Sequence, residues 1–269
     1  MFHPGVFGSA SSLRRRQRVE LCPTSGSTVR TADSHGRRIV RNGRMPCGSW
    51  MFGYRPPMRL AIVDFDGTAI RGNSWHEYFR AELRRRPSRA PLLLAGWMIR
   101  RCRIWQGVRL REFALAGQRG APRTELEAWG RHLYATRLRA GVRRELVREV
   151  ERRRRDGFVI VVATAAWDFM VMPFAAEIQT DAMVATRVAY AGDRCTGGIV
   201  GRECMGLGKQ EALLARFSMD SVDWDRSVFW TDHVSDIPLL KQVGERWFVT
   251  RLPNVPDGLP EGTRRFPAS

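Results

Sequence analysis

One short stretch constrains the fold more than any other part of the chain. Leu60–Val63 is an apolar run that contains β-branched residues, which is typical of a strand buried on both faces of a sheet. Asp64, Asp66, Gly67 and Thr68 follow it. Aspartate and glycine are poor strand residues, so the strand should end here, and the glycine permits a turn. Because residues i and i+2 of an extended chain point to the same side, both carboxylates could address one ligand.

The two carboxylates leave three interpretations open. Close carboxylates suit a hard cation that prefers oxygen ligands. They also suit a division of work in which one is a nucleophile and the other an acid and base. The simplest alternative is that Asp64 and Asp66 only cap the end of a strand. The rest of the chain has to distinguish these interpretations.

Further apolar runs that end in polar residues alternate with helical patterns, and this order predicts an α/β fold with a parallel sheet. Residues 185–200 contain glycines at turn positions and predict a hairpin instead of another crossover. Ser235 is expected to cap the helix that carries Leu239 and Leu240. The expected strands are 157–163, 227–230 and 246–250, and the expected helices are 168–178 and 207–217.

Residues 71–156 have helical spacing of apolar residues and are expected to form an inserted helical cap. The core is then expected to comprise residues 58–70 and 157–269. The insertion contains 23 arginines and 9 acidic residues, so the net charge of +18 is concentrated there and in the N-terminal segment. Part of this charge is expected on a solvated helix face. A basic cap over an acidic site would also attract an anionic substrate.

Residues 1–57 are rich in serine, glycine, proline and arginine and show little hydrophobic periodicity. Such a segment buries too little apolar surface to fold by itself. It is interpreted as a disordered basic extension, as a targeting peptide, or as a stretch outside the protein if translation begins at Met58.

Composition limits the compartment and the class of protein. The five cysteines (Cys22, Cys47, Cys102, Cys195 and Cys204) are scattered and show no CxxC spacing, which argues against a disulfide framework or a zinc site. The longest uncharged apolar runs, Pro91–Ile99 and Gly157–Trp167, are shorter than the ~20 residues that span a bilayer. No secretory signal is evident, and a cytoplasmic location is expected.

Four groups of polar residues are expected at one edge of the sheet: Asp64 with Asp66, Thr164, Lys209, and Asp232 with Asp236. Ligands of open parallel sheets bind at the carboxyl ends of the strands. Lys209 is notable because the only other lysine is Lys241, so a lysine at this position indicates a need for a compact charge in place of arginine.

The motifs in this order resemble the haloacid dehalogenase superfamily, in particular its phosphoserine-phosphatase-like branch, which has a helical cap. The resemblance covers about Met58 to Pro253. It implies a Rossmann-like α/β core with an inserted α-helical cap. The matching motifs are Asp-Phe-Asp-Gly-Thr at 64–68, Val-Val-Ala-Thr at 161–164, Gly-Leu-Gly-Lys at 206–209 and Asp-His-Val-Ser-Asp-Ile-Pro-Leu-Leu at 232–240.

The resemblance also implies a role for each site residue. Asp64 would be the nucleophile that forms an aspartyl-phosphate, and Asp66 would be the general acid and base. Thr164 and Lys209 would bind the phosphoryl group. Mg²⁺ would be held by Asp64, the carbonyl of Asp66 and Asp232, and the supporting residues would be Asp236, Gly67 and Thr68. A carboxylate at position 66 favours phosphatase chemistry, because the dehalogenases of this superfamily lack a carboxylate there, since a halide leaves without a proton.

The expected activity is a magnesium-dependent phosphatase that acts on a small phosphorylated metabolite. Thr231 and His233 depart from the usual fourth motif, and His233 is expected to be a solvated loop residue. Residues 69–74 lack the glutamate of true phosphoserine phosphatases, which argues against phosphoserine as the substrate.

Two alternatives remain. The stretch 91–105 combines leucines and tryptophans with arginines, and it is expected to form cap core with a basic outer face. If it were instead an interfacial patch on an anionic membrane, a lipid-phosphate phosphatase of the phosphatidylglycerophosphatase type would follow. The other class is a non-catalytic protein that binds RNA or anionic lipid. The complete set of acids, threonine and lysine argues against it, and no nucleic-acid partner is expected.

Overall fold

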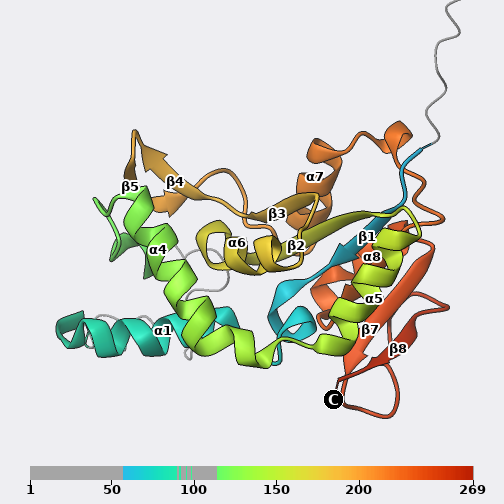
Figure 1. Ribbon diagram of the computed structural model, residues 1–269, viewed down its shortest axis with the longest axis horizontal. Helices are drawn as coiled ribbons and strands as arrows, with labels where there is room; N and C mark the ends of the chain where they lie inside the picture. The colour runs from blue at the N-terminus through green and yellow to red at the C-terminus, as the bar shows by residue number, and fades with distance from the viewer. Residues whose placement is uncertain (1–56, 90, 92–94, 96–97, 99–113, 269) are drawn as a thin grey trace, which may run out of the picture. The chain divides into compact units, whose positions relative to one another are not determined.

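The core of the protein is a six-stranded sheet in the order β3-β2-β1-β6-β7-β8, in which all neighbouring strands are parallel (Figure 1). The computed structural model describes residues 57–268 except 90, 92–94, 96–97 and 99–113. The parallel α/β core that was expected is confirmed. The strands are β1 (Leu60–Val63), β2 (Val159–Trp167), β3 (Ala182–Thr186), β6 (Val228–Thr231), β7 (Glu245–Thr250) and β8 (Arg264–Pro267).

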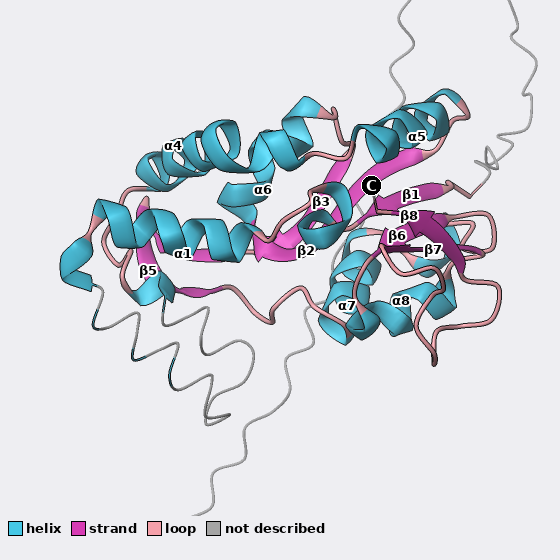
Figure 2. Cartoon of the chain, turned by 90° about the horizontal axis from the view of Figure 1, so that it is seen from below, coloured by secondary structure: helices cyan, strands magenta, loops and turns pink. Residues whose placement is uncertain are grey.

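Helices cover both faces of the sheet. Successive residues of a strand point to opposite faces, and in the central strands both sets of residues are apolar, so both faces have to be buried. Ala61 and Val63 belong to one buried cluster, and Leu60 and Ile62 belong to another. Figure 2 shows α5 on one face and α7 with α8 on the opposite face. The covering helices are α5 (Arg144–Arg155), α6 (Asp168–Glu177), α7 (Leu207–Arg216) and α8 (Ile237–Gln242).

The order of the strands reverses beside β1. From β1 the chain proceeds outward through β2 and β3, then returns to the other side of β1 and proceeds outward through β6, β7 and β8. At such a switch point the loops after neighbouring strands diverge, so a crevice opens at the carboxyl ends of the strands. Asp64 follows β1 and Asp232 follows β6, so both lie at this edge.

The insertion after β1 contains α1 (Ser74–Arg85) and α4 (Arg123–Leu133). These helices share a buried cluster with the hairpin of β4 (Val188–Ala191) and β5 (Arg194–Ile199), whose antiparallel pairing confirms the hairpin expected from the glycines. Figures 1 and 2 both place α1, α4 and the hairpin together. Trp167, at the end of β2, and Phe169, on α6, also belong to this cluster and so connect it to the core.

Helix α5, which was expected within the insertion 71–156, packs on the sheet instead. Leu146 and Val150 lie in the same buried cluster as Ile160 and Trp230. The apolar face of α5 therefore covers the core, and the boundary expected at residue 156 is too late by the length of this helix. The inserted region ends near Arg143, where the backbone returns to the segment that follows β1 and Arg143 N donates to Ala69 O.

Two other expectations differ from the structure. Strand β2 does not end at Thr164 but continues to Trp167, with an irregular register against β3 between these residues. Strand β8 was not expected, since its sequence is basic and polar. Residues 1–56 and most of 91–105 lie outside the described residues, so their interpretations stay predictions. Among the residues that are described, no helix has the length and apolar character needed to cross a membrane.

Candidate active site

The turn after β1 carries Asp64 and Asp66. The backbone N–H of Asp64 donates to Trp230 O at 3.0 Å, which joins the end of β1 to β6. Its Oδ1 accepts a hydrogen bond from Phe65 N at 2.7 Å, and the residue is 7% exposed. Gly67 then adopts φ 71°, a left-handed conformation in which glycine has no steric penalty. The turn therefore depends on the glycine, as expected.

Lys209 joins two of the expected carboxylates. Its Nζ lies 3.2 Å from Asp64 Oδ2 and 2.6 Å from Asp236 Oδ2. Asp236 Oδ2 also accepts a hydrogen bond from the hydroxyl of Thr231 at 2.7 Å. All four side chains are buried, and Lys209 is only 2% exposed. The ammonium group thus has a fixed position at the carboxyl end of β1.

Asp232 is held against the turn after β1. Its Oδ1 accepts a hydrogen bond from the hydroxyl of Thr68 at 3.0 Å. A Cβ atom added to Gly67 would lie 1.9 Å from Asp232 Oδ2, so a side chain at position 67 would displace this carboxylate. Gly67 therefore serves both the turn and the close approach of Asp232. Asp232 and Thr68 lie in the segments that follow β6 and β1, which are neighbours in the sheet.

Thr164 lies on the continuing strand β2 and is buried. Because Val162 pairs with Val63, Thr164 lies two residues further on, beside the turn that begins at Phe65. Its hydroxyl oxygen accepts a hydrogen bond from Ala166 N at 3.2 Å. A hydroxyl that accepts in this way still has its own proton to donate.

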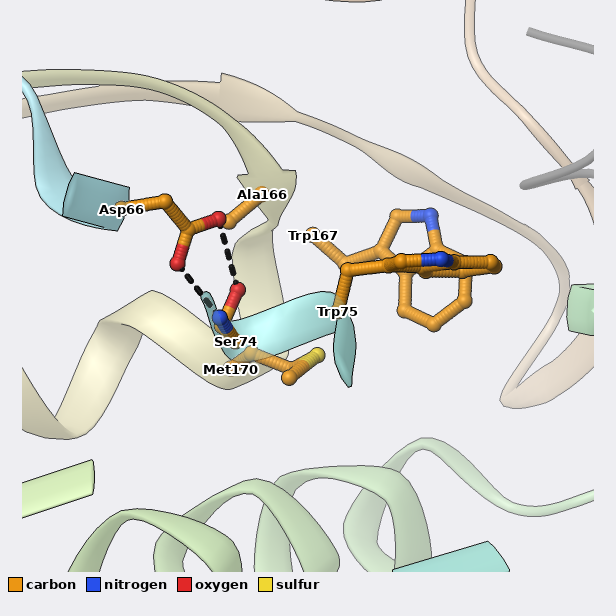
Figure 3. A pocket seen from close by; sticks show the side chains of 6 residues that line it. All are labelled: Asp66, Ser74, Trp75, Ala166, Trp167 and Met170. Carbon is orange, nitrogen blue, oxygen red and sulfur yellow. Dashed lines mark hydrogen bonds between the residues drawn. The ribbon is translucent and has the colours of Figure 1, made fainter. Parts of the chain in front are cut away.

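Asp66 has a different partner from Asp64. Ser74, the first residue of α1, donates to it twice, from N to Oδ1 at 2.6 Å and from Oγ to Oδ2 at 2.9 Å (Figure 3). The start of the first inserted helix thus holds the second carboxylate. Beside this pair is a pocket whose other lining residues are Trp75, Ala166, Trp167 and Met170. The two aspartates expected to address one ligand are therefore held from opposite directions, by the core and by the insertion.

The site carries more negative charge than its lysine can neutralise. Burial is the main reason why the pKa of Asp64 is raised to about 7; Lys209 lowers it in part, and Asp236 and Asp232 contribute to the increase. Burial likewise raises the pKa of Asp232. The pKa of Lys209 is lowered by burial, but the neighbouring carboxylates outweigh this effect and raise it. The lysine is therefore protonated, and the remaining carboxylate charge favours a bound cation.

The residues fit Mg²⁺, although they do not form a complete protein shell. In the described part of the chain, no three His, Cys, Asp or Glu side chains converge to hold a metal by themselves. Mg²⁺ usually keeps several waters and needs only one or two carboxylates from a protein. Buried Asp236 Oδ1 has no hydrogen-bond partner among the described residues, and such an oxygen is suited to a cation or to a water bound to one.

Arg143 supports the site but was not expected from the sequence. It is 4% exposed, and its guanidinium donates to Thr68 O at 3.0 Å and to Gly67 O at 3.2 Å. Its backbone N–H donates to Ala69 O at 2.9 Å, beside an antiparallel bridge between Ile70 and Val142. The segment that leaves the insertion therefore pairs with the segment that enters it. No local signal distinguishes Arg143 among the many arginines of this region.

The loop after β6 also differs in detail from the expectation. The side chain of His233, and not that of Ser235, accepts the hydrogen bond at the start of the short helix Val234–Asp236. Its Nδ1 lies 3.1 Å from Ser235 N and 2.8 Å from Ser235 Oγ. His233 therefore has a structural role in the loop. Thr231, noted in the sequence only as a departure from the family motif, is the hydroxyl that positions Asp236.

Comparison with solved structures supports the fold. A protein of unknown function from Bordetella pertussis Tohama I is 25% identical, with a TM-score of 0.65 over 74% of this chain and 92% of that one. A HAD family hydrolase from Salmonella enterica serovar Typhi is 16% identical, with a TM-score of 0.57 over 76% and 66%. A phosphoserine phosphatase structure is 15% identical, with a TM-score of 0.52 over 72% and 87%.

The sequence comparisons concern the family. No curated protein matches the chain. The model of the haloacid dehalogenase-like hydrolase family matches residues 61–241, which begin at the first strand and end within α8. The match therefore includes the turn after β1, the insertion, Lys209 and the loop after β6. On this match, together with the shared fold, the chain belongs to the haloacid dehalogenase-like hydrolase family.

Proposed function

We propose that the protein is a magnesium-dependent phosphatase that hydrolyses a phosphomonoester through an aspartyl-phosphate on Asp64. The observation that carries the proposal is the contact of Lys209 with Asp64 and Asp236 at the carboxyl end of β1. A fixed ammonium beside a carboxylate can bind the oxygens of a phosphoryl group where charge develops. Phosphoryl transfer requires mainly such positioning and charge neutralisation.

Asp64 is the proposed nucleophile. Phe65 N holds its Oδ1, and Lys209 holds its Oδ2, so the direction of the carboxylate is set before substrate binds. A lysine at this distance stabilises the carboxylate and the incoming phosphoryl oxygens together. The hydroxyl of Thr164 accepts a hydrogen bond from Ala166 N, and it would donate its own proton to the same phosphoryl group. Asp236 would act through Lys209 as a positioning residue.

Asp66 is the proposed general acid and base. It would protonate the ester oxygen as the P–O bond breaks, and it would then take a proton from the water that attacks the aspartyl-phosphate. Ser74 holds both of its oxygens in the present arrangement, so the start of α1 sets the position of this carboxylate. The proton-transfer group thus belongs to the turn of the core but is oriented by the insertion.

Mg²⁺ would be held by Asp64, Asp232 and the backbone carbonyl of Asp66, with waters at the remaining positions. When bound, it would neutralise negative charge on the phosphoryl group and on the carboxylates. The hydrogen bond from Thr68 and the missing side chain at Gly67 together place Asp232 for this role.

The structural neighbours are consistent with this chemistry. One of them is described as a phospho-aspartyl intermediate analogue of phosphoserine phosphatase. We propose a small phosphorylated metabolite as the substrate, in the cytoplasm, where the free, buried Cys195 and Cys204 would stay reduced. The lipid-phosphate alternative depends on the stretch 91–105, most of which lies outside the described residues.

The proposal is tested with p-nitrophenyl phosphate and Mg²⁺. Because p-nitrophenol leaves without a proton, Asp66→Asn should still form the aspartyl-phosphate but hydrolyse it slowly. We expect a burst of about one p-nitrophenol per enzyme and a covalent phosphate detectable by mass spectrometry. Asp64→Asn should give neither the burst nor turnover, with a loss of roughly 10³-fold or more.

The result that would overturn the proposal is equally specific. If Asp64→Asn kept wild-type turnover, another group would be the nucleophile. If the wild-type protein hydrolysed no phosphomonoester but bound RNA with a steep dependence on salt, the non-catalytic alternative would replace the enzyme.

A further inference from the structure

The pocket beside Asp66 has a composition that the proposed chemistry does not require. Asp66 comes from the turn after β1, Ser74 and Trp75 from α1, Trp167 from the end of β2 and Met170 from α6. Figure 3 shows Asp66 and the two indole rings on opposite sides of Ser74. The pocket therefore extends from the carboxylate toward an apolar wall.

The apolar wall is built from aromatic rings that pack against one another. The rings of Trp75 and Trp167 meet edge to face, with centroids 5.2 Å apart and an interplanar angle of 76°. Tyr78 packs against Trp167 from behind in the same manner, at 4.9 Å and 88°. Trp167 and Met170 are almost fully buried, whereas Trp75 is partly exposed. Trp75 is thus the part of the wall that a bound molecule can reach.

The pocket offers little to a charged group. Among its described lining residues, only Asp66 is ionisable. The other polar groups of these side chains are the hydroxyl of Ser74 and the N–H groups of the two tryptophans. Ser74 directs both its N–H and its hydroxyl toward Asp66. A charged group in this space would lose water without gaining an ion pair, which is costly.

We infer that this pocket receives the leaving group of the substrate and selects an uncharged, apolar group attached to the phosphoester oxygen. The inference rests on the proposed function, in which Asp66 gives its proton to that oxygen as the P–O bond breaks and the Asp64–phosphorus bond forms. The carbon next to the oxygen must then lie beside Asp66, at the mouth of the pocket. Its further carbons contact Trp75.

This specificity differs from that of a phosphoserine phosphatase. The amino nitrogen and the carboxylate carbon of phosphoserine are both three bonds from the ester oxygen, so they would lie where the pocket provides the side chains of Trp75 and Met170. An alkyl or benzyl group of the same length would instead bury apolar surface there. The favourable change is about fourfold in binding for each CH₂ group buried.

The test compares esters of primary alcohols, whose leaving groups have similar reactivity. We expect kcat/KM to rise along ethyl, butyl and hexyl phosphate and to be high for benzyl phosphate. The kcat/KM for O-phosphoserine and phosphoethanolamine should be at least tenfold lower than for hexyl or benzyl phosphate. Burying about two additional CH₂ groups accounts for a difference of this size. Equal or better hydrolysis of O-phosphoserine would overturn the inference but leave the proposed function intact. Failure to hydrolyse any of the esters, or p-nitrophenyl phosphate, would overturn both.

Substitutions of Trp75 locate the selectivity. Trp75→Ala should lower kcat/KM for hexyl phosphate roughly tenfold but change that for ethyl phosphate little, because only the longer chain reaches the ring. Trp75→Phe should retain most of the preference, and Trp75→Arg should shift it toward O-phosphoserine. The control is Trp129→Ala, on α4, which removes a partly exposed tryptophan that does not line the pocket. An unchanged ratio of hexyl to ethyl phosphate in all three Trp75 variants would overturn the inference.

A final arm distinguishes the source of the apolar group. Dioleoyl phosphatidate is offered in phosphatidylcholine vesicles, at the same concentration of phosphate as hexyl phosphate in solution. Hydrolysis of hexyl phosphate alone supports the pocket and a soluble ester. Hydrolysis of both, with the same dependence on Trp75, supports the pocket and a lipid source. Hydrolysis of phosphatidate that is insensitive to Trp75 would overturn the inference.

Discussion

Gly67 is the residue at which backbone conformation and site geometry depend on each other most closely. It has a positive φ, and the space where its Cβ would lie is filled by the carboxylate of Asp232. We expect Gly67→Ala to destabilise the protein by about 1–2 kcal/mol through the left-handed backbone. We also expect kcat to fall about 100-fold, because a shift of roughly 1 Å in the position of the Asp232 carboxylate has an effect of this size.

The control is a glycine in the same loop. Gly72 has nothing within 4 Å of its added Cβ and no positive φ. Gly72→Ala should therefore change neither kcat nor the midpoint of urea denaturation appreciably. If Gly67→Ala lost stability but kept kcat, the position of Asp232 would not matter to the reaction.

Arg143 leads to a second prediction at this scale. Its guanidinium donates to two carbonyl oxygens of the turn that follows Asp64. Arg143→Gln should lower kcat about tenfold with little change in KM, since it removes buried hydrogen bonds from a charged donor, each of which is worth ~1.5–3 kcal/mol. The matched control is Arg144→Gln, because Arg144 is 61% exposed and only touches Glu177 at 3.5 Å. Equal effects of the two substitutions would contradict a positioning role for Arg143.

Site residues with strong chemical character could be predicted from the sequence, whereas their supporting residues could not. Lys209 is one of only two lysines in the chain, Asp64 and Asp236 lie at a strand end and a helix start, and the structure brings Lys209 within contact distance of both. Arg143 and Ser74 resemble dozens of other arginines and serines in the chain. Their roles arise from tertiary contacts with residues far away or across a turn, which local patterns do not encode.

At the scale of elements, a partly buried ion pair joins α5 to β7. Both nitrogens at the end of Arg153 contact Glu245, at 2.7 and 2.6 Å, and Arg153 Nε contacts Glu149 at 2.9 Å. The side chain of Arg153 is 11% exposed. We expect Glu245→Gln to lower the free energy of unfolding by about 2 kcal/mol, as for a charge-assisted bidentate pair. Urea denaturation measures this change.

The control and the pH dependence separate this pair from general surface effects. Glu211→Gln removes the exposed pair with Arg202, whose side chains are both 61% exposed, and should change stability by less than about 0.5 kcal/mol. Burial raises the pKa of Glu245, but hydrogen bonds from Arg153 and Trp247 outweigh it and lower the pKa below its ordinary 4.5. A lowered folded pKa gives stability that is present above pH 4.5 and lost as the pH falls through the folded value. The difference between wild type and Glu245→Gln should therefore shrink only below about pH 4.5.

The elements themselves could be predicted where hydrophobic pattern determines them. Strands β1, β6 and β7 and helices α6 and α7 lie where their apolar periodicity places them. The packing partner of α5 could not be predicted, because an amphipathic helix has the same pattern whether it covers a sheet or another helix. Strand β8 could not be predicted from hydrophobic pattern, because an edge strand needs few apolar residues and its four residues are mostly exposed.

At the scale of the whole molecule, the site is assembled from segments that are distant in sequence. The turn after β1, the strand β2, the start of α7 and the loop after β6 meet only when the sheet order is complete. Three carboxylates then lie near one lysine, and burial raises the pKa of Asp64 and of Asp232. The folded protein therefore tolerates an excess of negative charge that a bound cation would relieve, so binding of the cation should be coupled to global stability.

This coupling gives the last prediction. A ligand at 100 times its Kd adds about 2.7 kcal/mol of stability. For a domain of this size we therefore expect saturating Mg²⁺ to raise the Tm by roughly 5 °C or more. Asp232→Asn should lose most of the increase, yet without metal it should be at least as stable as wild type, because it removes one buried charge while the asparagine keeps the acceptor for Thr68. Glu211→Gln, which changes an exposed side chain, should keep the full increase in Tm with Mg²⁺. An equal Mg²⁺ response in Asp232→Asn would place the metal elsewhere, and a lower Tm of this variant without metal would show that the carboxylate is stabilising in itself.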